Sequence, residues 1–92
     1  MFAIAFDLVV EDIVRHYPRS IPAAYAEVRS LLAQHGFEWT QGSVYLSRDC
    51  DLTSLTMTMV ALRSLEWFPH VVRDIRAFRV ELWSDFTAFI KS

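Results

Sequence analysis

The sequence predicts an α+β domain with the element order βαββαβ, in which one antiparallel sheet carries both main helices on the same face. Short apolar runs near the start, the middle and the end of the chain alternate as strands do. Two longer segments between them carry apolar residues at helical spacing. This order is the split-βαβ pattern. A chain of 92 residues fits one domain, which we place over residues 1–92.

The first predicted strand spans residues 2–8. Its bulky side chains share one face, which should meet the helices, and its small side chains share the other. The second face also carries Asp7, the only charged residue of the run. A carboxylate in an apolar strand loses solvation and needs a partner, which could be a backbone NH, an arginine, a metal or a substrate. The alternative is a solvated aspartate at the end of a strand.

The first main helix should begin after Ser20, a favourable N-cap residue, and end near His35. Gly36 follows at the position where a helix end favours left-handed backbone geometry. Before this helix, Glu11–Tyr17 predicts a short helical turn, because Pro18 then interrupts the segment.

Two short strands are predicted at 37–41 and 43–47, on either side of Gly42. Asp51 is a plausible N-cap for the second main helix, which we place at 52–67. Its inner face should consist of residues at 3-4-3 spacing, namely Leu52, Leu55, Met59 and Leu62.

Pro69 should mark the exit from the second helix, and the last strand is predicted at 75–83. Ser84 and Asp85 can then cap a short C-terminal helix. The result is a ferredoxin-like sheet with both helices on one face and the other face open. Because 53% of the residues are hydrophobic, we expect a homodimer to cover apolar surface.

The composition argues against several classes of protein. Cys50 is the only cysteine, so no intrachain disulfide can form, which suggests a reducing, cytoplasmic compartment. No run is long enough to span a membrane, and the first residues lack the features of a signal peptide. The net charge of −2 is not that of a general nucleic-acid binder. With only two glycines, the chain has no phosphate-binding or dinucleotide-binding loop.

Three groups of residues are candidates for chemistry. Asp7 could face its own copy across a two-fold axis, where paired carboxylates bind a divalent cation such as magnesium or raise each other's pKa. Because no second carboxylate lies within reach of Asp7 in sequence, we expect such a metal site to need Asp7 from both chains. Gln41 and Ser43 could bind a phosphate or a base edge, or serve ordinary turn chemistry.

Near the last strand, Arg73, Asp74 and Arg76 form the third group. They could form structural ion pairs. Alternatively, the two arginines could hold phosphate, a role that suits the guanidinium group, while Asp74 orients one of them.

At these same residues the sequence resembles the virulence-associated protein D (VapD) family, in order and at matching spacing. The resemblance lies in five blocks, Ala3–Leu8, Gly36–Tyr45, Glu66–Phe68, Val72–Phe78 and Ser84–Thr87. It implies a ferredoxin-like homodimer related to the small CRISPR-associated nucleases, with endoribonuclease activity on messenger-type RNA. It also implies the toxin half of a toxin–antitoxin pair, with a small antitoxin protein as partner. By position, it implies functional roles for Asp7, Ser43 and Asp74.

The resulting hypothesis is a homodimeric endoribonuclease that cleaves single-stranded or messenger RNA. Bases would lie near Trp39 or Trp83 and phosphates near Arg73 and Arg76, while Asp7 acts as a metal ligand or an acid/base group. The alternative is a non-catalytic nucleic-acid-binding or protein-assembly module of the CRISPR-associated scaffold type. The acidic pI of about 5.8 opposes a DNA scaffold, which would need a basic stripe.

Overall fold

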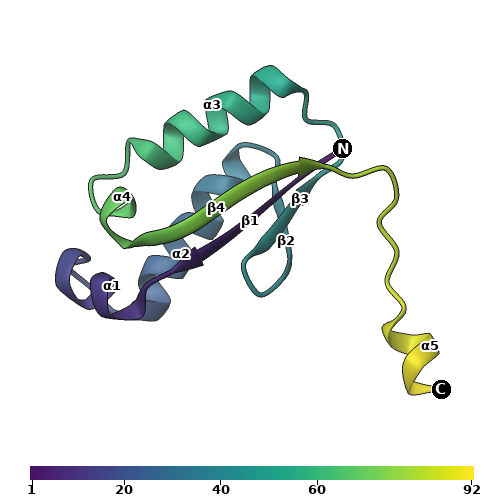
Figure 1. The fold of residues 1–92 in the computed structure, drawn as a ribbon, viewed down its shortest axis with the longest axis horizontal. Helices are drawn as coiled ribbons and strands as arrows, with labels where there is room; N and C mark the ends of the chain where they lie inside the picture. Colours follow the sequence, from purple (N-terminus) through teal and green to yellow (C-terminus); the bar gives the residue numbers. More distant parts are fainter.

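The computed structural model describes residues 1–92 and contains one antiparallel sheet of four strands (Figure 1). The strand order is β2-β3-β1-β4, and β1 pairs with both β3 and β4. This is the predicted ferredoxin-like order. The strands are β1 (Phe2–Leu8), β2 (Glu38–Gln41), β3 (Val44–Ser47) and β4 (Val72–Arg79).

Five helices accompany the sheet, and the predicted N-caps of the two main helices are confirmed. The Ser20 side chain accepts a hydrogen bond from the backbone NH of Ala23, and the Asp51 carboxylate accepts one from the NH of Ser54 at 2.7 Å. Each bond satisfies an NH that the first helical turn leaves unpaired. The helices are α1 (Val10–His16), α2 (Ile21–Gln34), α3 (Leu52–Arg63), α4 (Phe68–Val71) and α5 (Thr87–Lys91).

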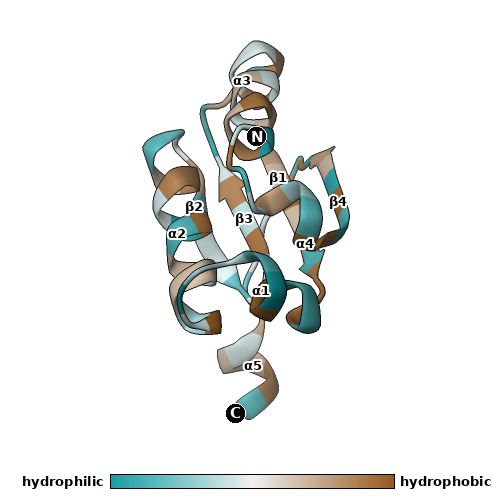
Figure 2. Cartoon of the chain, turned by 90° about the vertical axis from the view of Figure 1, so that its left-hand side faces the viewer, coloured by the Kyte–Doolittle hydropathy of each residue, from teal (hydrophilic) through white to brown (hydrophobic).

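The hydrophobic core lies between the helices and one face of the sheet. Ile4 and Phe6 of β1 are buried there with Val28 and Leu32 of α2, as the alternation of β1 predicts. Figure 2 shows the hydrophobic segments of β1 and β3 at the centre, surrounded by α1, α2, α3 and α4. Asp7 is exposed on the opposite, open face of the sheet. The fold therefore presents the charged position of β1 to solvent.

The second main helix begins at Leu52 as predicted, but its inner face and its end differ from the prediction. Its first residue, Leu52, is 67% exposed, and the polar Thr58 is fully buried instead. Thr58 can be buried because its hydroxyl donates to the carbonyl of Ser54 at 2.8 Å. The helix ends at Arg63, before the predicted 67, and Pro69 lies in the first turn of the separate α4. Proline is compatible with a first turn because its missing NH has no partner there.

The last strand is also shifted, from the predicted 75–83 to Val72–Arg79. Its length is set by its partner, because Arg79 already pairs with Phe2 at the start of β1. Beyond that pair, only one more bond forms, from the NH of Val80 to the carbonyl of Met1. The chain then has no neighbouring strand, so the alternating residues that follow cannot extend the sheet.

The segment that follows β4 leaves the sheet and ends in α5, well away from the other helices (Figure 1). Asp85 helps to begin α5, because its carboxylate accepts a hydrogen bond from the NH of Thr87 at 2.8 Å. We call residues 80–92 the C-terminal arm. Its exposed hydrophobic side chains are Leu82, Phe86, Phe89 and Ile90. None of the helices is both long and apolar enough to cross a lipid bilayer.

Candidate active site

Asp7 and Asp74 stand directly opposite each other on the open face of the sheet. They are a register pair of the antiparallel strands β1 and β4. Side chains in such a pair have Cβ atoms about 4.5–5.5 Å apart. Two carboxylates in this position repel each other unless positive charge lies close by.

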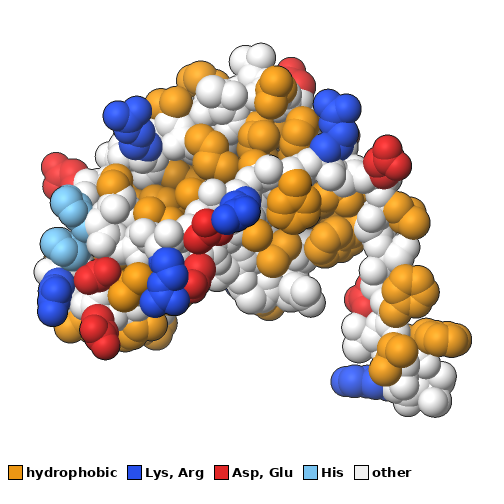
Figure 3. All heavy atoms as spheres, in the orientation of Figure 1, with side chains coloured by type: hydrophobic (Ala, Val, Ile, Leu, Met, Phe, Trp, Pro, Cys, Tyr) orange, Lys and Arg blue, Asp and Glu red, His pale blue; other side chains and the backbone are white.

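Two arginines supply that charge. Arg73 donates from Nη1 to Asp7 Oδ2 at 3.2 Å, and Arg76 donates from Nε to Asp74 Oδ2 at 3.1 Å. We call these four residues the Asp/Arg quartet. All four side chains are at least half exposed, so each ion pair contributes little to stability. Figure 3 shows acidic and basic side chains gathered in one group over the end of β1 and the start of β4.

The position of Arg73 results from an irregularity in the pairing of β1 with β4. Asp7 pairs with Asp74, but the next residue, Leu8, pairs with Val72, so Arg73 is an extra residue in β4. Such a bulge bends the strand and redirects a side chain. Here it brings Arg73 to Asp7. The sequence gives no direct signal for a bulge, and therefore the pairing of Asp7 with Asp74 could not be foreseen.

This register corrects one sequence-based expectation. A second carboxylate near Asp7 was expected only from a partner chain, but Asp74 of the same chain provides one. The physical reason is that β4 is antiparallel to β1, which brings together residues far apart in sequence. Two carboxylates can hold Mg²⁺ when phosphate oxygens and waters complete its octahedron. Nowhere do three or more His, Cys, Asp or Glu side chains form a potential metal site.

The turn between β2 and β3 lies beside the same end of β1. The backbone NH of Phe6, the residue before Asp7, donates to the carbonyl of Ser43 at 3.1 Å. The side-chain hydrogen bonds of this turn run from Trp39 to Gly42 and from Thr40 to Val44, and neither involves the Ser43 hydroxyl. The structure therefore brings the turn carrying Ser43 to the strand end that carries Asp7.

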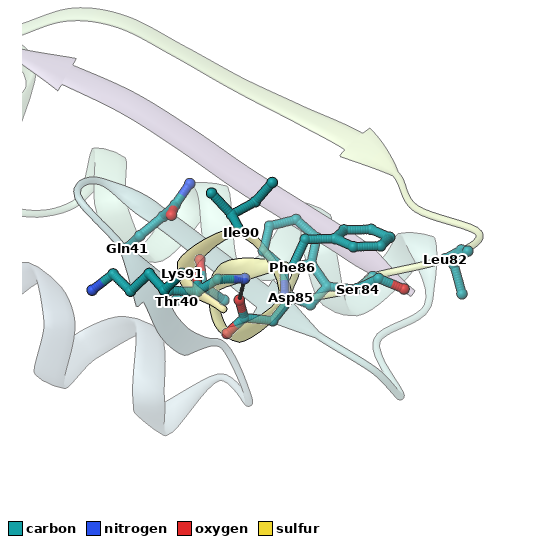
Figure 4. Close-up of a pocket in the computed structure, with 10 residues that line it drawn as sticks. Thr40, Gln41, Leu82, Ser84, Asp85, Phe86, Ile90 and Lys91 are labelled. Carbon is teal, nitrogen blue, oxygen red and sulfur yellow. Dashed lines mark hydrogen bonds between the residues drawn. The ribbon is translucent and has the colours of Figure 1, made fainter.

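Gln41 and Trp39 of β2 are placed differently. Gln41 lines a groove of about 730 Å³ between the β2–β3 turn and the C-terminal arm, and Figure 4 shows it facing Ile90 across this groove. Trp39 pairs with Tyr45, whose side chain is buried in the core, so Trp39 lies on the helix side of the sheet. The structure thus separates Trp39 from the open face that carries the quartet.

Trp39 has two partners that sequence reasoning missed. Its Nε1 donates to the carbonyl of Gly42 at 2.8 Å, and the guanidinium of Arg29 in α2 lies 4.5 Å from its ring centroid. Arg29 is ten residues upstream, on another element, and no sequence signal links it to Trp39. Arg29 also counteracts the burial that raises the pKa of the Tyr45 hydroxyl.

Curated relatives match the chain along almost its whole length. Endoribonuclease VapD of Dichelobacter nodosus is 50% identical over 91 residues, which cover 99% of this chain and 98% of the relative. An endoribonuclease VapD homolog of Neisseria gonorrhoeae and endoribonuclease VapD of Haemophilus influenzae are each 48% identical, and these matches cover both chains completely. No family model matches the chain.

Proposed function

Because the chain belongs to the endoribonuclease VapD family, we propose that it is an endoribonuclease that cleaves single-stranded or messenger RNA at the Asp/Arg quartet. The observation that carries the choice of site is the register pair of Asp7 and Asp74, each held by its own arginine. Paired carboxylates suit phosphodiester hydrolysis, and arginines suit the phosphate group.

In the proposed reaction, the RNA phosphate replaces the two carboxylates as the partner of the two arginines. Exposed ion pairs contribute only about 0–1 kcal/mol each, whereas a guanidinium binds phosphate through parallel, charge-assisted bonds. Binding of RNA would therefore draw Arg73 and Arg76 to the scissile phosphate and leave Asp7 and Asp74 free to act. Ser43, whose hydroxyl takes part in neither side-chain hydrogen bond of the turn, would donate to another oxygen of the same phosphate.

The freed carboxylates can act in two ways. In the first, the Asp7 carboxylate removes the proton of the attacking hydroxyl or water, while Asp74, after taking up a proton from solvent, donates it to the leaving oxygen. In the second, Asp7 and Asp74 hold a divalent cation such as magnesium, which would stabilise the charge that develops on the phosphate. Both ways use the same two side chains, and chelation of the metal distinguishes them.

A homodimer is part of this proposal. The C-terminal arm carries four exposed hydrophobic side chains, and the open face of the sheet carries Phe78, which is 45% exposed. Mutual burial of such surfaces is the usual driving force of association. If the open faces meet, the quartets of the two chains would lie close to the two-fold axis, and Asp7 of each chain could contribute to one site.

The test is cleavage of a fluorescent single-stranded RNA at saturating enzyme by the wild type, Asp7→Asn and Asp74→Asn, each with and without EDTA. We expect each substitution to lower the cleavage rate at least tenfold while the protein stays folded. Asp49→Asn, which removes an exposed carboxylate that makes no side-chain hydrogen bond, is the matched control. Wild-type cleavage by Asp7→Asn would overturn this site, and binding of duplex DNA without any RNA cleavage would favour the scaffold alternative.

We include in the proposal the toxin role in a toxin–antitoxin pair, within the cytoplasm. The lone Cys50 fits a reducing compartment, since it can form no intrachain disulfide. The test is induced expression in the host, which should arrest growth in an Asp7-dependent manner. Co-expression of a small protein encoded next to this chain should relieve the arrest, and normal growth in both cases would contradict the toxin role.

A further inference from the structure

The Trp39 side chain contacts both α2 and the β2–β3 turn and so connects these two elements. Its indole Nε1 donates to the carbonyl of Gly42 at 2.8 Å, and the Arg29 guanidinium covers its ring at 4.5 Å from the centroid. The bond saturates the only hydrogen-bond donor of the indole. Arg29 occupies one face of the ring, the surface on which a base would otherwise stack.

The Gly42 carbonyl lies in the turn between β2 and β3. Gly42 has a φ of +50°, and no atom lies within 4 Å of the position that a Cβ would take there. No other part of the protein therefore packs against Gly42 on the side of its Cβ position. On the far side of the turn, the Thr40 hydroxyl donates to the carbonyl of Val44 at 2.8 Å. The indole bond is thus the side-chain contact that fixes Gly42.

The next residue, Ser43, is the one whose carbonyl is bonded to the NH of Phe6 beside Asp7. We propose that Trp39, oriented by Arg29, is a positioning residue that holds the Gly42–Ser43 turn against the end of β1. This inference rests on the proposed function, because the purpose of the turn is to present Ser43 to the phosphate next to Asp7. Misplacement of a reacting group by about 1 Å can cost two orders of magnitude in rate.

Trp39→Phe is the sharpest test because it keeps an aromatic ring under Arg29 but removes the indole NH. We expect kcat on a short single-stranded RNA to fall about tenfold, with KM changed less than twofold, because the turn loosens without losing a substrate contact. Arg29→Ala should lower kcat about threefold, since the ring is then less well oriented. The double variant should be no slower than Trp39→Phe, because both residues act through one bond.

A second readout does not depend on activity. The backbone NH of Phe6 donates to the Ser43 carbonyl, so its exchange with solvent deuterium reports how firmly the turn is held. We expect this exchange to be several-fold faster in Trp39→Phe than in the wild type, with exchange in α3 unchanged. Arg63→Ala, which removes a cation that makes no ion pair and covers no aromatic ring, is the matched control for Arg29→Ala.

The possible results separate this inference from the proposed function. A raised KM at constant kcat in Trp39→Phe would assign Trp39 to base stacking and overturn the positioning role. Unchanged kcat, together with unchanged Phe6 exchange, would also overturn it, while Asp7→Asn could still be inactive. Full activity of Asp7→Asn would overturn the site itself, and with it the catalytic purpose of the turn.

Discussion

Asp7 and Asp74 face each other across β1 and β4, and the wild-type fold keeps these like charges together only with two arginines at 3.2 and 3.1 Å. Directly opposed like charges destabilise a sheet. A fold selected for stability alone would not place them there. The arrangement is typical of a functional site, where stability is given up for reactivity.

The first prediction follows from this repulsion. Asp74→Asn should leave the midpoint of thermal unfolding equal to or slightly above that of the wild type, because it removes one of two opposed charges, while RNA cleavage falls at least tenfold. Circular dichroism melts and cleavage rates on the same preparation would check this. A drop of the midpoint by more than a few degrees would mean that the carboxylate has a structural role instead.

The second prediction concerns the arginine that the bulge provides. Arg73→Ala should leave Asp7 beside Asp74 with one less positive charge, and the free energy of unfolding should fall by about 0.5–1 kcal/mol, as for an exposed ion pair. The loss should shrink in 0.5 M salt, because exposed charges are then screened. It should also shrink when Asp74→Asn is added, since the repulsion is gone. Urea titrations of the two single variants and the double variant would show whether the effects couple.

The quartet shows where sequence reasoning succeeds and where it stops. The alternation of apolar residues in β1 correctly placed Asp7 on the open face, because a strand has a fixed period of two. The range of β4 was wrong by about three residues, because its ends are set by the partner strand and not by its own alternation. The bulge at Arg73, which decides the pairing of Asp7 with Asp74, depends on both strands together.

The same distinction applies to the β2–β3 turn. Gly42 could be assigned to it from the sequence, because glycine favours positive φ. The role of Trp39 could not, since its partners are a carbonyl three residues ahead and a guanidinium on α2. The backbone preference of a single residue can be predicted from its own segment. A contact between two elements can be identified only once the fold is known.

The third prediction tests the backbone of that turn. At a φ of +50° and with open space around its Cβ position, Gly42→Ala should cost about 1 kcal/mol in folding free energy through backbone strain alone. Gly42→Asn should cost less, because asparagine tolerates left-handed geometry. Urea unfolding of both variants measures the difference. If the two variants are equally stable, tolerance of a positive φ is not the reason for glycine at this position.

The fourth prediction concerns the N-cap of α3. Hydrogen bonds from Ser54 lower the pKa of the Asp51 carboxyl below its usual value of 3.8. A carboxyl whose pKa is lower in the folded state stabilises the fold at pH values above its usual pKa, and this stabilisation is lost as the pH falls through the lower, folded-state pKa. Asp51→Ala should therefore lower the midpoint of thermal unfolding at pH 7, and the difference from the wild type should narrow between pH 4 and pH 2.

The matched control for the cap is Asp49→Asn, in the same loop. Asp49 makes no side-chain hydrogen bond, so this variant should melt like the wild type at pH 7. If Asp49→Asn lowers the midpoint of thermal unfolding as much as Asp51→Ala does, the negative charge of the loop stabilises the fold and the N-cap hydrogen bond does not.

The last prediction concerns the C-terminal arm. Phe86, Phe89 and Ile90 are 65–76% exposed and face the same side of α5 at i, i+3 and i+4. Full burial of one such side chain stabilises an interface by about 1.5–3 kcal/mol. Replacing all three by serine should therefore convert a dimer into a monomer at micromolar concentration, as measured by light scattering after gel filtration. Because these side chains pack against little of their own chain, the monomer should keep its circular dichroism spectrum. The control is Val14→Ser, at an equally exposed hydrophobic position of α1, which should remain dimeric. If the wild type is monomeric even at 100 times the working concentration, the arm does not hold a dimer.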